Sequence, residues 1–198
     1  MSLTLSQSYF QHRDVVYLAK DLIGKKITTC IDGKTTSGII TETEAYAGRG
    51  DKACHAHLGR FTERTKVMYK PGGIAYVYLC YGIHHLFNIV TNTRRNADAI
   101  LIRAVEPLEG IDTMRKRRGK EKLDKTLTSG PGNFTKAFGI SKTHNEMSVI
   151  SKELNIEHIS YKPKSLVETK RIGIDYADED VDLPWRFYDN LSKFVSKK

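Results

Sequence analysis

The sequence has few cysteines and no long hydrophobic run. Its three cysteines, Cys30, Cys54 and Cys80, are widely spaced and form no CxxC pair, so neither a disulfide framework nor a structural zinc site is predicted. No stretch approaches the roughly 20 apolar residues of a membrane span, and residues 1–11 lack the regions of a signal peptide. We therefore expect an intracellular protein with no metal, no cofactor and no membrane segment.

Acidic residues are the minority among the charges. The chain of 198 residues has 23 Asp and Glu against 32 Lys and Arg, which gives a formal net charge of +9, and 39% of it is hydrophobic. This length and composition predict one folded domain over 1–198. The positive surplus favours a polyanionic partner such as nucleic acid or an anionic membrane, while simple solubility is the alternative that charge alone leaves open.

The pattern of apolar residues predicts a mixed α+β domain. Its sheet is expected to be mainly antiparallel and built from hairpins, with helices outside it. Helices are predicted over 14–23, 109–118 and 131–138. Strands are predicted over 26–31, 35–46, 74–80, 85–91 and 99–105, with Pro107 closing the last one. Two late strands are expected at 171–174 and 186–188, and 142–170 is interpreted as mostly irregular.

The segment Glu42-Thr43-Glu44-Ala45-Tyr46 is the most informative part of the chain. Alternation along a strand places Glu42, Glu44 and Tyr46 on one face, so two carboxylates and a phenol share a surface. Two carboxylates on one face repel each other, which favours a raised pKa for one that is partly buried. Such a carboxylate is in the usual environment of a general base. The alternative is an exposed acidic pair on an edge strand.

Histidines and cysteines cluster at Cys54-His55-Ala56-His57. The spacing matches no known zinc ligand frame, and a cysteine nucleophile is seldom a sequence neighbour of its histidine base. One interpretation is that a histidine here presents a ring face or an N–H to a substrate. The other is that its ring only forms a hydrogen bond with a backbone group.

Five of the ten tyrosines fall within one 36-residue window, from Tyr46 to Tyr81. Aromatic faces on a basic protein suit the stacking of nucleic-acid bases. Tyr76 and Tyr78 share a strand face, and for these two the pattern favours a role in the core. Tyr81 lies at a predicted hairpin tip, where it has no core to fill and has the shape of a wedge that opens a base step.

Basic residues form two clusters, at 60–66 and 115–122. Arg60 and Arg64 belong to the first and are candidate contacts for phosphates, although a charge run is more often just a solvated face. Arg103 stands alone in an apolar strand. A buried arginine requires a partner, and the carboxylate of Glu44 is the expected one.

Motifs along nearly the whole chain resemble those of the alkyladenine (3-methyladenine) DNA glycosylase family. They are ETEAY at 42–46, His55, MYKPG at 68–72, YVY at 76–78, Tyr81-Gly82, Asn88-Ile89, LIRAVEP at 101–107, SGPGN at 129–133, RIGI at 171–174 and WRFY at 185–188. The resemblance implies a curved antiparallel sheet similar to the C-terminal domain of methionyl-tRNA formyltransferase. It also implies monofunctional hydrolysis of the bond between deoxyribose and a damaged purine, of the 3-methyladenine and hypoxanthine class, after base flipping.

The resemblance also implies a role for each site residue. Glu44 is expected to deprotonate the attacking water, which Arg103 and the backbone carbonyl of Ile172 help to hold. Among the remaining positions, Tyr46 and Tyr78 would stack on the extruded base, His55 would form a hydrogen bond with it, Asn88 would disfavour normal guanine and Tyr81 would fill the gap in the duplex.

Double-stranded DNA with damaged purines is thus the expected partner of a monomeric enzyme. Its location would be cytoplasmic and nucleoid-associated in a bacterium, or nuclear in a eukaryote. For a neutral purine an acid must protonate the leaving base, and the residues considered so far supply none. Two further hypotheses remain at this point, a non-catalytic nucleic-acid-binding protein on the same scaffold and a metal-dependent hydrolase that uses Cys54, His55 and His57.

Overall fold

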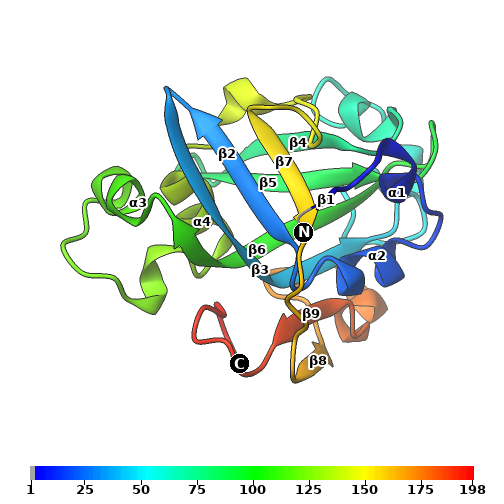
Figure 1. Cartoon of the computed structure of the whole chain (residues 1–198). Helices are drawn as coiled ribbons and strands as arrows, with labels where there is room; N and C mark the ends of the chain where they lie inside the picture. Colours follow the sequence, from blue (N-terminus) through cyan, green and yellow to red (C-terminus); the bar gives the residue numbers. More distant parts are fainter. Residues whose placement is uncertain (1–2) are drawn as a thin grey trace.

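Nine strands form one antiparallel sheet that curls around the main core (Figure 1). The computed structural model describes residues 3–198. Seven strands follow the spatial order β1-β7-β2-β3-β6-β5-β4, and β9 joins β3 and β8 off this path. The strands are β1 (Leu3–Thr4), β2 (Lys26–Ile31), β3 (Lys34–Tyr46), β4 (Ile74–Cys80), β5 (His84–Thr91), β6 (Asp98–Glu109), β7 (Leu154–His158), β8 (Leu166–Thr169) and β9 (Arg186–Asp189).

Within residues 3–198, four helices accompany the sheet, together with short 3₁₀ turns. The helices are α1 (Gln7–Phe10), α2 (Val15–Asp21), α3 (Ile111–Arg118) and α4 (Pro131–Phe138). The 3₁₀ turns are His57–Gly59, Lys66–Tyr69, Lys125–Leu127, Lys142–His144 and Asp178–Asp182. No helix within residues 3–198 combines the length and the apolar character that crossing a membrane requires.

Local sequence explains where α2 and α4 begin and end. The Asp14 side chain accepts a hydrogen bond from the Tyr17 backbone N–H at 2.9 Å, which caps the start of α2. Pro131 stands at the first turn of α4, and Gly139 ends it in a left-handed conformation (φ 77°). Phe134 and Phe138 of α4 are fully buried in the main hydrophobic core, as is Phe87 of β5. The three predicted helices are therefore present within one or two residues of their expected bounds.

β3 is the longest strand and the hub of the sheet. Its 13 residues pair with β2, β6 and β9, so the half that carries Glu42 and Glu44 has a neighbour on each side. The register with β6 shifts around Glu42, which is the mark of a β-bulge. A bulge re-aims the side chains that follow it, and here these include the predicted catalytic carboxylate.

Two predictions about the elements were wrong. Pro107 does not close β6, because it lies opposite Gly38 at another register shift and the strand runs on to Glu109. Residues 171–174 are not a strand, since the Ile172 N–H donates to a side chain and Gly173 has a φ of 77°. The stretch 142–170 is mostly irregular, as predicted, although it contains the short strands β7 and β8.

The remaining expectations for the fold have different outcomes. The α+β class and the curved antiparallel sheet are confirmed. The similarity to the formyltransferase domain and the single domain over 1–198 stay predictions.

Candidate active site

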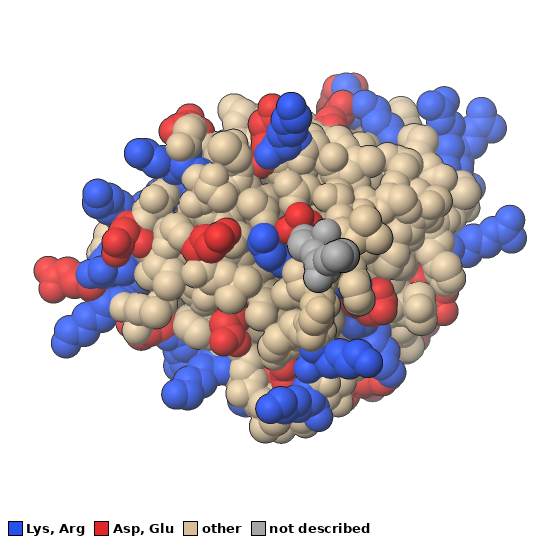
Figure 2. Space-filling view, in the orientation of Figure 1, with Lys and Arg blue, Asp and Glu red and all other residues tan. Residues whose placement is uncertain are grey.

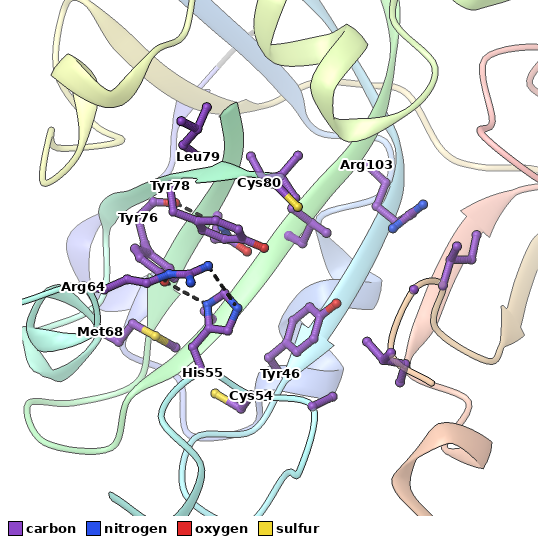
Figure 3. Close-up of a pocket in the computed structure, with 18 of the residues that line it drawn as sticks. Tyr46, Cys54, His55, Arg64, Met68, Tyr76, Tyr78, Leu79, Cys80 and Arg103 are labelled. Carbon is purple, nitrogen blue, oxygen red and sulfur yellow. Dashed lines mark hydrogen bonds between the residues drawn. The ribbon is translucent and has the colours of Figure 1, made fainter. Parts of the chain in front are cut away.

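A cavity of about 480 Å³ lies where the ends of β3, β4, β5 and β6 meet the loop 53–64 and the segment 172–176 (Figure 3). Eight of the ten predicted site residues line it, namely Tyr46, His55, Arg64, Tyr78, Tyr81, Asn88, Arg103 and Ile172. The structure therefore brings together residues that are up to 126 positions apart in the chain. Glu44 and Arg60 are the two that do not line it.

Glu44 lies directly behind the cavity lining, fully buried. Its Oε1 accepts a hydrogen bond from the Ile172 N–H at 2.7 Å, and its Oε2 accepts one from Tyr46 Oη at 2.9 Å and one from Arg103 Nη1 at 3.2 Å. All three donors belong to residues of the lining. A carboxylate offers about four lone-pair positions, so this group can still accept one more donor such as a water molecule.

Glu42 is equally buried, but its carboxylate is occupied by hydrogen bonds that hold the fold together. Arg103 Nε at 3.1 Å, Arg186 Nη1 at 2.8 Å and Ser196 Oγ at 2.8 Å all donate to its Oε1, and the Ser196 N–H donates to its Oε2 at 2.7 Å. These four donors use the accepting capacity of the carboxylate. The interpretation of Glu42 and Glu44 as an exposed acidic pair is therefore wrong. Glu42 contacts the lining through Arg103 alone, whereas all three donors to Glu44 belong to lining residues.

Arg103 bridges the two carboxylates, as the sequence predicted for Glu44. Burial lowers the pKa of its guanidinium, but the adjacent Glu44 and Glu42 carboxylates outweigh this and raise it above the ordinary value. The arginine is thus charged and neutralises part of the negative charge beside Glu44. Breaking such a buried pair leaves an uncompensated charge, which is strongly destabilising.

His55 is held by hydrogen bonds at both ring nitrogens, which Figure 3 shows as dashed lines. Nδ1 lies 2.8 Å from Tyr76 Oη, and Nε2 lies 3.3 Å from Arg64 Nη2. Because arginine only donates, Nε2 must accept and the ring proton resides on Nδ1. Burial lowers the pKa of His55 to about 4, helped by the positive charges of Arg64 and Arg60, so the imidazole is neutral at physiological pH.

The predicted base-stacking residues surround this histidine. The ring of Tyr78 stands edge-on to His55 with centroids 4.8 Å apart, and Tyr46 faces the cavity from the opposite side in Figure 3. Burial, together with the Glu44 carboxylate, raises the pKa of Tyr46 well above its ordinary value, so its hydroxyl keeps its proton and donates it to Glu44. Asn88 lines the cavity and is nearly buried, and its amide donates to the Tyr76 carbonyl at 3.1 Å.

Tyr81 has a very different environment from the other tyrosines. Its side chain is 91% exposed at the tip of the hairpin between β4 and β5, where its φ is 50°. Ile83 on the same turn is also exposed. These two side chains form an exposed apolar projection at the mouth of the cavity. They do not pack on the core, so packing does not explain their presence.

The two predicted phosphate contacts are placed differently. Arg60 is exposed outside the cavity, whereas Arg64 lines it and reaches His55 and Tyr76. Within residues 3–198 neither guanidinium has a carboxylate within 4.0 Å.

Sequence reasoning missed the support beneath Tyr46. Arg171 forms a two-pronged ion pair with Asp51, donating at 2.5 and 2.9 Å, and its guanidinium lies 4.9 Å from the Tyr46 ring centroid. The motif RIGI at 171–174 was the available signal, but it was interpreted as a strand.

The cysteine and metal hypotheses receive no support from this geometry. Burial raises the pKa of the Cys54 thiol to about 12, so this thiol is protonated and is a poor nucleophile. Among the residues from 3 to 198, no three His, Cys, Asp or Glu side chains are grouped so that they could hold a metal ion.

A buried carboxylate with spare accepting capacity, next to a solvent-open cavity walled by aromatic rings, defines a hydrolase-like site for a flat ligand. The family model described as methylpurine-DNA glycosylase matches residues 9–193, and the chain belongs to this family of DNA-repair glycosylases.

Its relatives agree with this membership. A protein from Chlamydia felis is 50% identical over 197 residues, covering 98% of this chain and 99% of its own. Proteins from Alkaliphilus oremlandii and Clostridium perfringens are each 45% identical, and each comparison covers 96% of this chain and 97% of the relative. All three carry the name "Putative 3-methyladenine DNA glycosylase".

Proposed function

We propose that the protein is a monofunctional DNA glycosylase that removes alkylated or deaminated purines, of the 3-methyladenine and hypoxanthine class, from double-stranded DNA. The observation that carries the proposal is the position of Glu44 behind an aromatic cavity, with three donors from the lining on its carboxylate. We expect the protein to act as a monomer without a cofactor. In a bacterium it would work in the cytoplasm, on the nucleoid.

The proposed chemistry begins with a water molecule held by the free accepting position of Glu44. As the bond between C1′ and the purine nitrogen stretches, positive charge develops on the sugar, and the carboxylate both stabilises this charge and accepts the proton of the water. Arg103 orients the carboxylate through its hydrogen bond to Oε2, at 3.2 Å. The backbone carbonyl of Ile172, next to the N–H that binds Glu44, is the proposed second holder of the water.

The proposed binding mode places the extruded base between the aromatic side chains of the cavity. Tyr46 would stack on one face of the base and Tyr78 on the other, with His55 as a neutral hydrogen-bonding partner. Asn88 would crowd the 2-amino group of normal guanine. Stacking of this kind contributes about 1–3 kcal/mol per base, which is comparable to the few kcal/mol that flipping costs.

The exposed hairpin tip supplies the proposed wedge. Tyr81 would enter the duplex from the minor groove and fill the space that the flipped nucleotide leaves. Its high exposure supports this role, because the side chain covers no part of the core.

The test of this proposal is base release from duplex DNA that carries one hypoxanthine or one 3-methyladenine. Under single-turnover conditions the native protein should leave an abasic site. The Glu44→Gln variant keeps the size of the side chain but cannot accept the proton, so its rate should fall by about 10²–10⁴-fold. Lesion binding should persist, because Glu42 still pairs with Arg103 in this variant.

A native protein that binds lesion DNA but releases no base would instead identify a non-catalytic binding protein. Normal turnover by the Glu44→Gln variant would remove Glu44 from its proposed role. Full activity in the presence of a chelator is expected, because no step uses a metal ion.

A further inference from the structure

Arg64 places a positive charge in the cavity wall that no carboxylate balances. Its Nη2 lies 3.3 Å from His55 Nε2, its Nε donates to Tyr76 Oη at 3.3 Å, and its guanidinium carbon is 4.5 Å from the Tyr78 ring centroid (Figure 3). All of these partners are neutral. The neighbouring Glu63 does not compensate, because its carboxylate forms an ion pair with Lys66 at 2.6 Å.

The other arginine of the lining is placed very differently. Arg103 has both Glu42 and Glu44 within 3.2 Å, so its charge is largely neutralised on the sugar side of the site. Arg171, behind Tyr46, is likewise paired with Asp51. Among residues 3–198, Arg64 is thus the cation of this cavity whose field remains available to a bound ligand.

The neighbours of Arg64 are poor proton donors to a purine. Burial and nearby arginines lower the pKa of His55 to about 4, so its imidazolium is absent near neutral pH. Burial raises the pKa of Tyr76 to about 12, and the Tyr46 hydroxyl is already donated to Glu44. A neutral purine that leaves this cavity therefore depends on a fixed positive charge more than on a proton.

We propose that Arg64 stabilises the negative charge that develops on a neutral purine as it leaves, and that it thereby favours deaminated purines such as hypoxanthine over cationic alkylated ones. This inference rests on the proposed glycosylase function and specifies its substrate class. It assigns Arg64 to the leaving base rather than to the DNA backbone, where the sequence had placed it.

The bond changes explain why the two substrate classes differ. When the bond between C1′ and N9 breaks, its electron pair remains on the purine, the water oxygen bonds to C1′, and the water proton passes to Glu44. Hypoxanthine becomes anionic at this stage and is protonated afterwards, by solvent or by Glu44. A purine methylated on a ring nitrogen starts as a cation and leaves neutral, so Arg64 has no developing anion to stabilise.

The experiment compares one duplex sequence that contains either hypoxanthine or 3-methyladenine, whose nucleoside is cationic and has no 2-amino group. The second-order rate constant of base release is measured under single-turnover conditions for the native protein and for Arg64→Gln. The loss of one donor for a developing anion should lower the rate on hypoxanthine about 10-fold or more. The rate on 3-methyladenine should change by less than about 3-fold, because no negative charge develops on that leaving base.

Two further variants make the comparison specific. Arg64→Lys keeps the charge and should restore part of the rate on hypoxanthine. Arg60→Gln removes the same charge from the same loop but outside the cavity, so it should affect both substrates alike and leave their ratio unchanged. The melting temperature of Arg64→Gln should fall by only a few degrees, because Arg64 is exposed and the two hydrogen bonds that are lost join it to neutral partners.

The outcomes distinguish a failure of the role proposed for Arg64 from a failure of the proposed glycosylase function. An equal loss on both substrates, no loss on either, or a native protein that releases 3-methyladenine but never hypoxanthine would overturn the role of Arg64 and leave the glycosylase intact. A native protein that releases neither base would refute the proposed function, and the inference with it.

Discussion

At the scale of single residues, His55 shows how neighbours fix a protonation state. Burial lowers its pKa to about 4, and the positive charges of Arg64 and Arg60 act in the same direction. The hydrogen bond from Arg64 to Nε2 also selects the tautomer with its proton on Nδ1. At neutral pH the histidine can therefore present its ring to a base, but it cannot supply an acidic proton. Its Nε2 can accept a hydrogen bond from a base only where Arg64 gives up the one it makes.

This environment predicts an unusual titration. The ring signals of His55 in heteronuclear NMR spectra should stay constant from pH 8 down to about pH 5, whereas the urea-unfolded chain should titrate near its ordinary value of about 6.5. Because the folded pKa is the lower one, the unfolded chain binds more protons between about pH 4 and 6.5. His55 thus makes a contribution to folding stability that falls as pH is lowered through this range. A folded-state midpoint near pH 6.5 would contradict the neutral, tightly held imidazole.

Part of the site could be predicted from the sequence, namely the part in which one buried residue requires a partner of opposite charge. Arg103 lies in an apolar strand, and its buried charge required a carboxylate, which Glu44 supplies at 3.2 Å. The cavity contacts of Arg64 and the ion pair of Arg171 with Asp51 could not be predicted in this way. Both depend on the path of irregular loops, which hydrophobic periodicity does not describe.

At the scale of the elements, β3 and β6 form the frame on which the carboxylate depends. The strands approach closely at Gly38, where a Cβ atom would lie 2.5 Å from the Glu106 carbonyl oxygen and 2.5 Å from Val105 Cγ1. Backbone atoms cannot yield to such a contact without moving the strands. This glycine therefore allows the register shift that precedes the bulge at Glu42.

Gly38→Ala should consequently destabilise the protein. Overpacking of this kind costs about 1–3 kcal/mol, which would lower the midpoint of urea denaturation. Gly50→Ala is the matched control, because no atom lies within 4 Å of the position of its Cβ and its φ is not positive. Equal stability of the two variants would show that β3 and β6 can separate at Gly38 without loss.

Elements with a local cause were the predictable ones. The hairpin between β2 and β3 follows from Asp32-Gly33, whose positive φ values of 55° and 67° suit its tight turn. β7 and β8 have no such local signal. They are short and are held by pairing with distant strands, β7 with β1 and β2 and β8 with β9. Long-range pairing overrides weak local preference at such positions.

At the scale of the whole molecule, the net charge of +9 is unevenly available for binding. On the face in Figure 2, basic and acidic side chains are interspersed, so a polyanion bound there would contact negative as well as positive charges. The basic cluster on α3 is also largely engaged within the fold. Arg115 pairs with Asp112 at 3.1 Å, and Arg117 and Arg118 donate to backbone carbonyls. Near the cavity, in contrast, Arg60 is exposed and has no acidic partner within residues 3–198.

These differences predict which cluster faces DNA phosphates. The affinity of the Glu44→Gln variant for lesion duplex should fall steeply with salt, and each phosphate contact contributes about 0.9 to the slope of log K against log salt concentration. Adding Arg60→Gln should reduce that slope by about 1, whereas adding Lys116→Gln, on the exposed side of α3, should leave it unchanged. The reverse pattern would place the DNA on α3, and an affinity that ignores salt would mean that the positive surplus serves solubility alone.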